Sequence, residues 1–254
     1  MQTRSHSKYG WLPQLPDHRD HKFTLSFDET VFPPLIDLRP HMPPVYDQGQ
    51  IGSCTANGIA AAIQYDQIKN KNKWQFEPSR LFIYYQERVI EGTVDSDSGA
   101  MIRDGVKACA TIGACADFRW PYDVTKFTEK PSNWAYWSAG VHKITNYASV
   151  GQNLNSLKSA LLAGFPVVFG FTVYSAFESA EVATTGMLPM PGPSDTILGG
   201  HCVLIVGYDD SKQSFIVRNS WGSGWGLSGY FYMFYSYVTN PDLASDFWVI
   251  NTTN

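Results

Sequence analysis

Residues 48–69 read QGQIGSCTANGIAAAIQYDQIK, and this stretch decides how the rest of the chain is interpreted. Apolar residues recur at helical spacing after Cys54, which predicts a helix over residues 54–69. Gly52 and Ser53 provide a turn and a cap-like start just before it. A thiol attacks only as the thiolate, and the first turn of a helix favours an anion through its unpaired N–H groups and its dipole. Cys54 is therefore a candidate nucleophile, although a structural cysteine is the commoner interpretation of one such residue alone.

A candidate base lies far downstream, where Gly199 and Gly200 precede His201 at the start of a predicted strand. Glycines let the backbone pass close to another element, so this histidine can present its ring to a cleft. The other histidines fall in predicted loops or in the polar N-terminal segment: His6, His18, His21, His41 and His142.

Two amide side chains complete the set. Asn219 ends a predicted strand and opens the run NSWGSGWG, and its side-chain oxygen could accept an imidazole N–H and so fix the tautomer of His201. Gln48 precedes Cys54 by one short loop, and its amide together with the Cys54 N–H could donate to an oxyanion. Taken singly, each is better explained as a turn or loop residue, and only their combination indicates a catalytic site.

The predicted elements change character along the chain. Helices are expected in the first half, at residues 54–69, 79–90 and 101–111. A short helix at 155–163 and a buried strand at 167–173 follow. Strands are expected in the second half, at 201–208, 215–219, 230–234 and 247–250. This order predicts an α+β fold with two lobes, and a ligand would bind in the cleft between them.

The residues around these four positions closely resemble the papain family of cysteine peptidases, in particular bacterial members with a short N-terminal extension. The matching segments are Gln48 to Cys54, Gly200-His201-Cys202-Val203 and Asn219-Ser220-Trp221-Gly222. Further matches at 36–39, 120–122, 166–168 and 229–231 extend the resemblance over residues 35–254. It implies a helical left lobe, an antiparallel, barrel-like right lobe and an active-site cleft between them.

The resemblance also implies the chemistry. Cys54 would attack a peptide carbonyl, His201 would act as general base and acid, Asn219 would orient His201, and Gln48 would stabilise the oxyanion. Attack would give a tetrahedral intermediate, and loss of the amine would leave a thioester acyl-enzyme that water hydrolyses. No cofactor or metal is needed, and the partner is a peptide or protein. The sequence contains no His-His insertion of the kind that caps some relatives, so endopeptidase action is favoured.

The resemblance also implies which residues contact the substrate. Gly99 matches the glycine-rich wall beside the S2 pocket, which holds the side chain of P2, the second residue before the scissile bond. Ala100 stands where a second glycine is usual, and its methyl would narrow the groove. The S2 lining would be apolar, with Ser245 or Asp246 near its floor, and this predicts an apolar P2 residue. The remaining predicted substrate-binding residues are Met101, Ile102, Gly170, Gly200, Cys202 and Trp221.

Three departures from the family pattern stand out. Ile51 replaces a common cysteine and Asp97 replaces its usual disulfide partner, so the bridge is absent, as fits a reducing compartment. Thr55 replaces the usual aromatic residue after the nucleophile, which is expected to loosen the packing behind Cys54. Whether Cys109 and Cys115 are bridged stays open.

The third departure is the N-terminal segment, residues 1–34, which is polar and much shorter than the usual inhibitory propeptide. Trp11, Leu12 and Leu15 are expected to anchor it to the body. It would be either a compact prosegment that keeps a zymogen inactive or a permanent strap over part of the cleft, with the peptidase domain at residues 35–254.

Composition excludes several classes of protein. The net charge is −4 without a clustered basic face, so no nucleic-acid partner is expected. Gly164 and Pro166 interrupt the longest uncharged stretch, so no membrane span is expected. The chain is expected to be a monomer. No secretory signal is visible, which makes the cytoplasm the default location, while family analogy leaves a lysosomal or secreted one open.

Two other functions use the same residues. A papain-like binding protein without activity is disfavoured because all four active-site positions are intact. A cysteine acyltransferase would need an amine acceptor that outcompetes water, and the sequence leaves this alternative open. A zinc site is disfavoured because no closely spaced Cys or His pair occurs.

Overall fold

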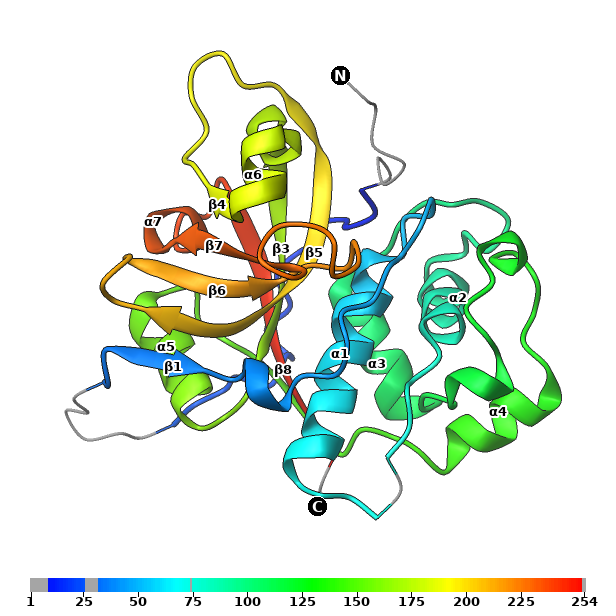
Figure 1. Ribbon diagram of the computed structural model, residues 1–254. Coiled ribbons are helices and arrows are strands. Elements are labelled where there is room, and N and C mark those ends of the chain that lie inside the picture. The colour runs from blue at the N-terminus through cyan, green and yellow to red at the C-terminus, as the bar shows by residue number, and fades with distance from the viewer. Residues whose placement is uncertain (1–8, 26–31, 74, 253–254) are drawn as a thin grey trace.

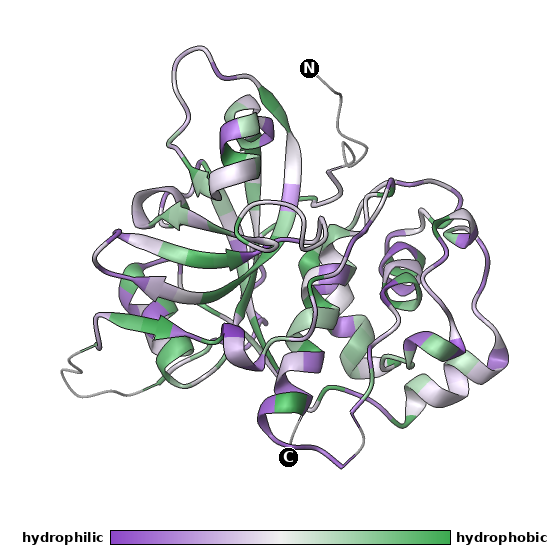
Figure 2. Ribbon diagram, viewed as in Figure 1, coloured by the Kyte–Doolittle hydropathy of each residue, from purple (hydrophilic) through white to green (hydrophobic). Residues whose placement is uncertain are grey.

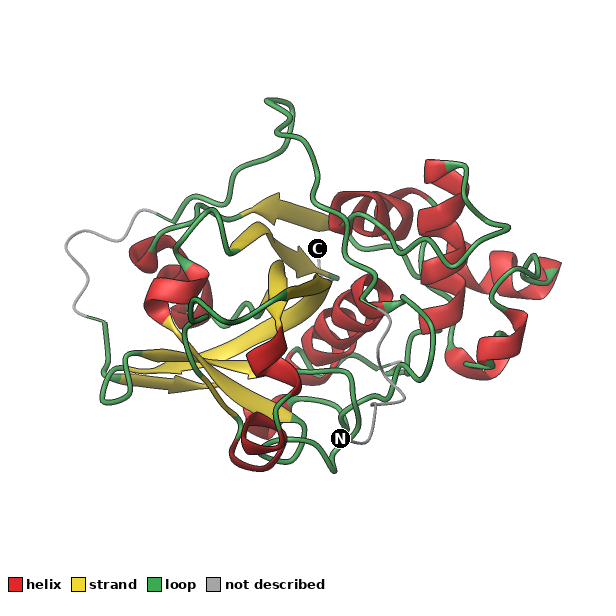
Figure 3. Cartoon of the chain, turned by 90° about the horizontal axis from the view of Figure 1, so that it is seen from above, coloured by secondary structure: helices red, strands yellow, loops and turns green. Residues whose placement is uncertain are grey.

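The computed structural model describes residues 9–25, 32–73 and 75–252, and Figure 1 shows two lobes side by side. Seen from above in Figure 3, long helices make up one lobe and strands dominate the other. The helices are α1 Cys54–Lys69, α2 Arg80–Glu91, α3 Ile102–Thr111, α4 Asn133–Gly140, α5 Leu154–Leu162, α6 Ala180–Thr185 and α7 Tyr235–Val238. The strands are β1 Leu35–Asp37, β2 Asn146–Ser149, β3 Val167–Tyr174, β4 Met187–Leu188, β5 Ile197–Asp209, β6 Ser214–Arg218, β7 Tyr230–Phe234 and β8 Ala244–Asn251. The predicted α+β, two-lobed fold is confirmed.

The strands form one sheet in the order β2-β8-β3-β5-β6-β7-β4, and β1 also pairs with β5. All pairings are antiparallel except that of β4 with β7. Figure 2 shows apolar residues along these strands and on the helices beside them. His201 lies within the long strand β5, directly opposite Phe171 of β3, so the central strands of the sheet fix its position.

Helix α1 lies between the lobes and is buried over most of its length. Small residues let it pack closely on the sheet: a methyl group at Gly58 would lie 3.2 Å from Cys202 Sγ of β5. Cys54 and His201 therefore belong to two elements that contact each other directly. Among the described residues, no helix combines the length and the hydropathy that a membrane crossing requires.

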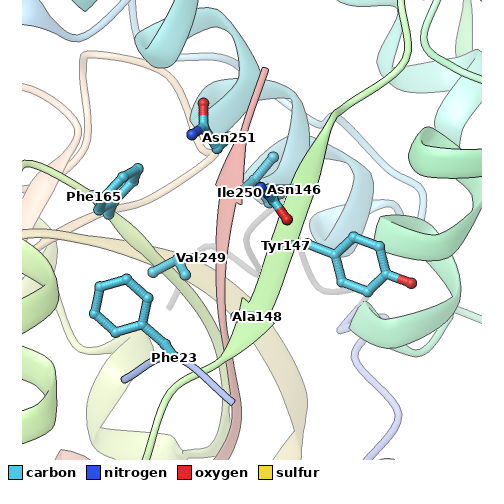
Figure 4. Close-up of a pocket in the computed structure, with 8 residues that line it drawn as sticks. All are labelled: Phe23, Asn146, Tyr147, Ala148, Phe165, Val249, Ile250 and Asn251. Carbon is cyan, nitrogen blue, oxygen red and sulfur yellow. The ribbon is translucent and has the colours of Figure 1, made fainter. Parts of the chain in front are cut away.

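Residues 9–25, which we call the strap, run along both lobes. Trp11 forms a β-bridge with Ala100, and Lys22 forms another with Ser149 of the edge strand β2. Next to the bridge between Lys22 and Ser149, the backbone N–H of Phe23 donates to Ser149 O at 2.8 Å. Figure 4 shows its ring facing Val249, in a pocket at this edge of the sheet that Phe165 also lines.

The predicted anchors of the N-terminal segment are only partly right. Trp11 is buried, with 5% of its surface exposed, but Leu15 is 83% exposed and Leu12 is also exposed. The prediction for Leu15 is wrong because the strap is attached there through backbone and polar groups rather than through that side chain. Residues 1–8 and 26–31 of the predicted segment lie outside the described residues.

Candidate active site

Cys54 is the first residue of α1 and is fully buried. Ser53 does not cap the helix as predicted, because its hydroxyl forms a hydrogen bond with the Tyr122 hydroxyl instead. Burial raises the pKa of the Cys54 thiol to about 12, although hydrogen bonds from the backbone of Cys202, Gly10 and Thr55 lower it. Cys54 is therefore an uncharged thiol at neutral pH in this arrangement.

His201 is fully buried, and its Nε2 lies 2.8 Å from Asn219 Oδ1. The Ser220 backbone N–H donates to the same oxygen, so Nε2–H is the donor to Oδ1. Burial lowers the pKa of His201 to about 4, and the hydrogen bond to Asn219 opposes this shift. Nδ1 has no hydrogen-bond partner among the described residues. The imidazole is thus held in one tautomer with Nδ1 able to accept a proton.

Aromatic rings surround this histidine. The Trp221 ring centroid lies 5.2 Å from that of His201, and the Tyr9 centroid lies 5.7 Å away. Phe171 and Phe177 are at 5.9 and 6.2 Å. This cluster keeps water away from the bond between His201 and Asn219. Trp221, predicted to bind substrate, lies against His201, and Tyr9 is contributed by the strap.

Gln48 is also buried, and its amide is held at both ends. Its Nε2 donates to Ile51 O at 3.0 Å, and its Oε1 accepts from the Ser220 hydroxyl at 2.6 Å. Ser220 was not predicted from the sequence, although it directly follows Asn219 in the motif. It links the loop of Gln48 to the loop of Asn219, and so connects two of the predicted catalytic positions.

The strap lies beside Cys54, because the backbone of Gly10 forms a hydrogen bond with the thiol. The Trp11 N–H donates to Gly200 O at 3.0 Å, and Leu12 N–H and Gly10 O pair with the backbone of Ala100 at 3.0 and 2.7 Å. A methyl group at Gly10 would lie only 1.7 Å from Gly52 O, so only glycine fits there. The strap therefore pairs with the backbone of Gly200 and Ala100, two residues that the sequence predicts to bind substrate.

The predicted substrate-binding residues are brought together in part. Gly99 packs against Gly10, and Ala100, Gly170 and Gly200 surround Trp11. Ile102 is fully buried, Cys202 Sγ faces Gly58 of α1, and Ser245 pairs with Gly170 between β8 and β3. The backbone N–H of Met101 donates to Glu91 at 2.7 Å. The carboxylate that reaches the Trp11 ring belongs to Asp246, whose Oδ2 accepts from Trp11 Nε1 at 3.0 Å.

The departures from the family pattern are compensated by hydrogen bonds. The Asp97 carboxylate accepts from the Gly52 N–H at 2.8 Å and from the Tyr84 hydroxyl at 2.6 Å, which joins its segment to the loop before Cys54. Thr55 is fully buried and donates to Glu87 at 2.8 Å, so the expected loosening behind Cys54 is not observed. All four cysteines are unbridged, including Cys109 and Cys115.

Comparisons with known proteins show the family to which the chain belongs. A family model described as papain family cysteine protease matches residues 32–247. Xylellain, a cysteine protease from Xylella fastidiosa, is 45% identical and superposes with a TM-score of 0.91, with 100% of both chains covered. A peptidase C1-like protein of Acanthamoeba polyphaga mimivirus is 42% identical over 98% of this chain and 89% of its own length.

A more distant structure shares the fold. Digestive procathepsin L 3 from Tenebrio molitor is 19% identical, with a TM-score of 0.74 over 97% of this chain and 76% of its own. The match of the family model over most of the chain, and the two relatives above 40% identity, agree with the resemblance seen in the sequence. The chain is a member of the papain family of cysteine proteases.

Proposed function

We propose that this peptidase cleaves peptide bonds, chiefly as an endopeptidase, through Cys54, His201, Asn219 and Gln48. The observation that carries the proposal is the buried contact of 2.8 Å between His201 Nε2 and Asn219 Oδ1. Because Nε2 keeps its hydrogen in that bond, Nδ1 is the nitrogen that can accept a proton from Cys54. Asn219 thus acts as a positioning residue for the base.

The reaction proceeds by acyl transfer. His201 Nδ1 takes the proton of Cys54 Sγ, and the thiolate attacks the peptide carbonyl carbon, whose π electrons move onto the oxygen. Collapse of this intermediate breaks the C–N bond, while Nδ1–H protonates the leaving amine. Water, deprotonated by the same nitrogen, then attacks the thioester and releases the carboxylic acid and the Cys54 thiolate.

The oxyanion is stabilised by Gln48 and by the Cys54 backbone N–H. Gln48 Nε2 carries two hydrogens, of which one is used on Ile51 O, and Ser220 fixes the amide by donating to Oε1. The second N–H remains for the oxygen of the substrate. A donor already fixed in place stabilises developing charge without reorganisation.

We expect Gln48→Ala to lower kcat by about 10²–10³-fold, the usual effect of removing one oxyanion donor. The measurement uses a fluorogenic peptide and a full-length chain that also carries Trp11→Ala, so that the cleft is opened. Gln50→Ala is the matched control, because Gln50 lies two residues away and is exposed. Equal kcat values for the two variants would contradict the role of Gln48.

Residues 1–34 are proposed to act as a prosegment, with residues 35–254 as the peptidase domain. The support is that Cys54 and His201 are both fully buried while the strap pairs with Gly200 and Ala100. While the strap is bound, its backbone occupies these hydrogen-bonding groups, so the backbone of a substrate cannot pair with them. The enzyme is therefore latent while the strap is in place.

The function is tested by intact-mass measurement after treatment with a papain-type epoxide inhibitor. In the full-length Trp11→Ala chain we expect one adduct, mapped to Cys54, and none when Cys54→Ala is added. The other three cysteines are buried and serve as internal controls. No adduct in the opened chain, although it is folded, would contradict the peptidase proposal.

A further inference from the structure

A second thiol lies beside the nucleophile. Cys202 belongs to β5 and directly follows His201, and it is buried, as Cys54 is. The backbone N–H of Cys202 donates a hydrogen bond to the Cys54 thiol. Because the N–Cα bond is only about 1.5 Å long, this hydrogen bond also brings the Cα atom of Cys202 close to the Cys54 sulfur.

The side chain of Cys202 points to the helix that carries the nucleophile. A methyl group at Gly58 would lie 3.2 Å from Cys202 Sγ, so this sulfur packs on α1 where glycine leaves the helix surface open. Gly58 follows Cys54 by one helical turn, and residues at this spacing lie on the same face of a helix. Cys202 Sγ therefore contacts the face of α1 that carries Cys54 at its end.

An electrostatic effect agrees with this contact. Burial raises the pKa of the Cys202 thiol, and the charge of a Cys54 thiolate raises it further. The interaction between two charges weakens as their separation grows, so the effect indicates that the two sulfurs are neighbours.

The other two cysteines lie elsewhere. Cys109 belongs to α3, and Cys115 lies in the loop after that helix. The pKa of Cys109 is raised by burial, by Glu87 and by Cys115, so these two thiols are neighbours of each other. Among the four cysteines, Cys202 is the one whose backbone bonds to the thiol of the nucleophile.

The geometry suits a disulfide between Cys54 and Cys202. A disulfide requires Cα atoms within about 7 Å of each other. The path from one Cα atom to the other through the hydrogen bond passes only Cβ and Sγ of Cys54 and N of Cys202. The backbone of Gly10 in the strap also bonds to the Cys54 thiol. Release of the strap therefore frees the thiol to rotate toward Cys202.

We propose that Cys202 protects the nucleophile by forming a reversible disulfide with Cys54 when hydrogen peroxide oxidises the opened enzyme. The inference rests on the proposed release of the strap and goes beyond the proposed function, since it requires no substrate. While the strap is bound, both thiols are buried and the peroxide does not reach them.

The reaction has two steps. The Cys54 thiolate attacks one oxygen of the peroxide, the O–O bond breaks, and hydroxide leaves, so that sulfur is oxidised to a sulfenic acid and the peroxide is reduced. The Cys202 sulfur then attacks the Cys54 sulfur and forms the S–S bond. The S–O bond breaks, and the leaving hydroxide takes the proton of the Cys202 thiol and departs as water.

The disulfide competes with further oxidation of Cys54. A sulfenic acid that meets a second peroxide becomes a sulfinic acid, which a thiol reductant does not restore. A dithiol reductant opens the disulfide by exchange, and its own two sulfurs become the oxidised pair. Cys202 would thus convert a permanent loss of the nucleophile into a loss that a reductant reverses.

The test uses the full-length Trp11→Ala chain, after a separate sample has shown that the epoxide inhibitor labels Cys54. The chain is treated with a small excess of hydrogen peroxide, denatured, alkylated and measured by mass spectrometry. We expect a loss of two hydrogens from the intact mass and a loss of alkylation at two cysteines. The peptide map should join the peptides of Cys54 and Cys202, and dithiothreitol should return both as thiols.

Two variants in the same background test the assignment. With Cys202→Ala added, the peroxide should produce Cys54 sulfinic acid, which dithiothreitol does not reverse. Cys109→Ala is the matched control, because Cys109 is equally buried but lies in α3, and its bridge between Cys54 and Cys202 should form as before.

The outcomes separate this inference from the proposed function. An epoxide adduct on Cys54 without a peroxide-dependent bridge would overturn the inference and leave the peptidase proposal intact. A bridge from Cys54 to Cys109 or Cys115 would also overturn it, as would equal recovery of the Cys54 thiol with and without Cys202. Absence of both the adduct and the bridge would contradict the proposed release of the strap, and the inference with it. The map of the chain that retains Cys202 decides the question even if Cys202→Ala does not fold.

Discussion

Trp11→Ala in the full-length chain is expected to raise the rate of Cys54 labelling by an epoxide inhibitor by at least about 100-fold. Truncation of a buried tryptophan to alanine lowers stability by about 3–5 kcal/mol. Because Trp11 belongs to the strap, this change weakens the docking of the strap and not the folding of the rest of the enzyme. Each 1.4 kcal/mol changes an equilibrium about tenfold, and the labelling rate follows the open fraction while that fraction is small. The rate is measured by mass spectrometry under mild reduction.

Leu15→Ala is the matched control for this experiment. Leu15 belongs to the same strap but is 83% exposed, so its truncation removes no packing. It should label at the rate of the unmodified chain. Equal rates for Trp11→Ala and Leu15→Ala, with both variants folded, would show that the Trp11 side chain does not hold the cleft closed.

The thiolate of Cys54 is expected to form at neutral pH only when the strap is released. In the closed arrangement burial raises the pKa of Cys54 to about 12 and lowers that of His201 to about 4, so both groups are uncharged between these values. Release exposes the pair to water, which removes the penalty on the charged forms and allows a thiolate to pair with an imidazolium. The pKa of Cys54 should then fall by several pH units.

The ultraviolet absorbance of the thiolate, followed during a pH titration, measures this change. The full-length chain should show no signal that depends on Cys54 near neutral pH, whereas Trp11→Ala should show one in proportion to its open fraction. Cys54→Ala provides the background, since burial also raises the pKa values of Cys109, Cys115 and Cys202. A Cys54 signal at neutral pH in the unmodified chain would contradict a closed, uncharged pair.

Local patterns predicted much of this fold. The helix that begins at Cys54 and the strand that contains His201 were predicted because short-range periodicity and glycine turns are visible within a few residues. Strand β8 was predicted only at 247–250, because the polar residues Ser245 and Asp246 interrupt its apolar pattern. The register of β8 against β3 shifts just after Ser245, and the Asp246 carboxylate there accepts a hydrogen bond from Trp11 Nε1.

The position of the strap could not be predicted in the same way. Trp11 and Leu15 are both apolar residues in a polar segment, yet only Trp11 is buried. The difference arises because Gly170 and Gly200 have no side chains and so leave space for the indole of Trp11. Both glycines lie far from Trp11 in the sequence. Such a long-range fit leaves no periodic signal, and the family resemblance suggested a prosegment or a strap without saying which side chain would fill the pocket.

The hydrogen bonds of Asp97 have a consequence for the conditions in which the enzyme can work. They hold together Gly52 and the segment before Gly99, the places where relatives commonly use a disulfide. A disulfide has a reduction potential and can be opened by excess thiol, whereas a hydrogen bond is unaffected by the redox potential of its surroundings. A strong reductant can therefore keep Cys54 as a thiol without loosening the loop that precedes it.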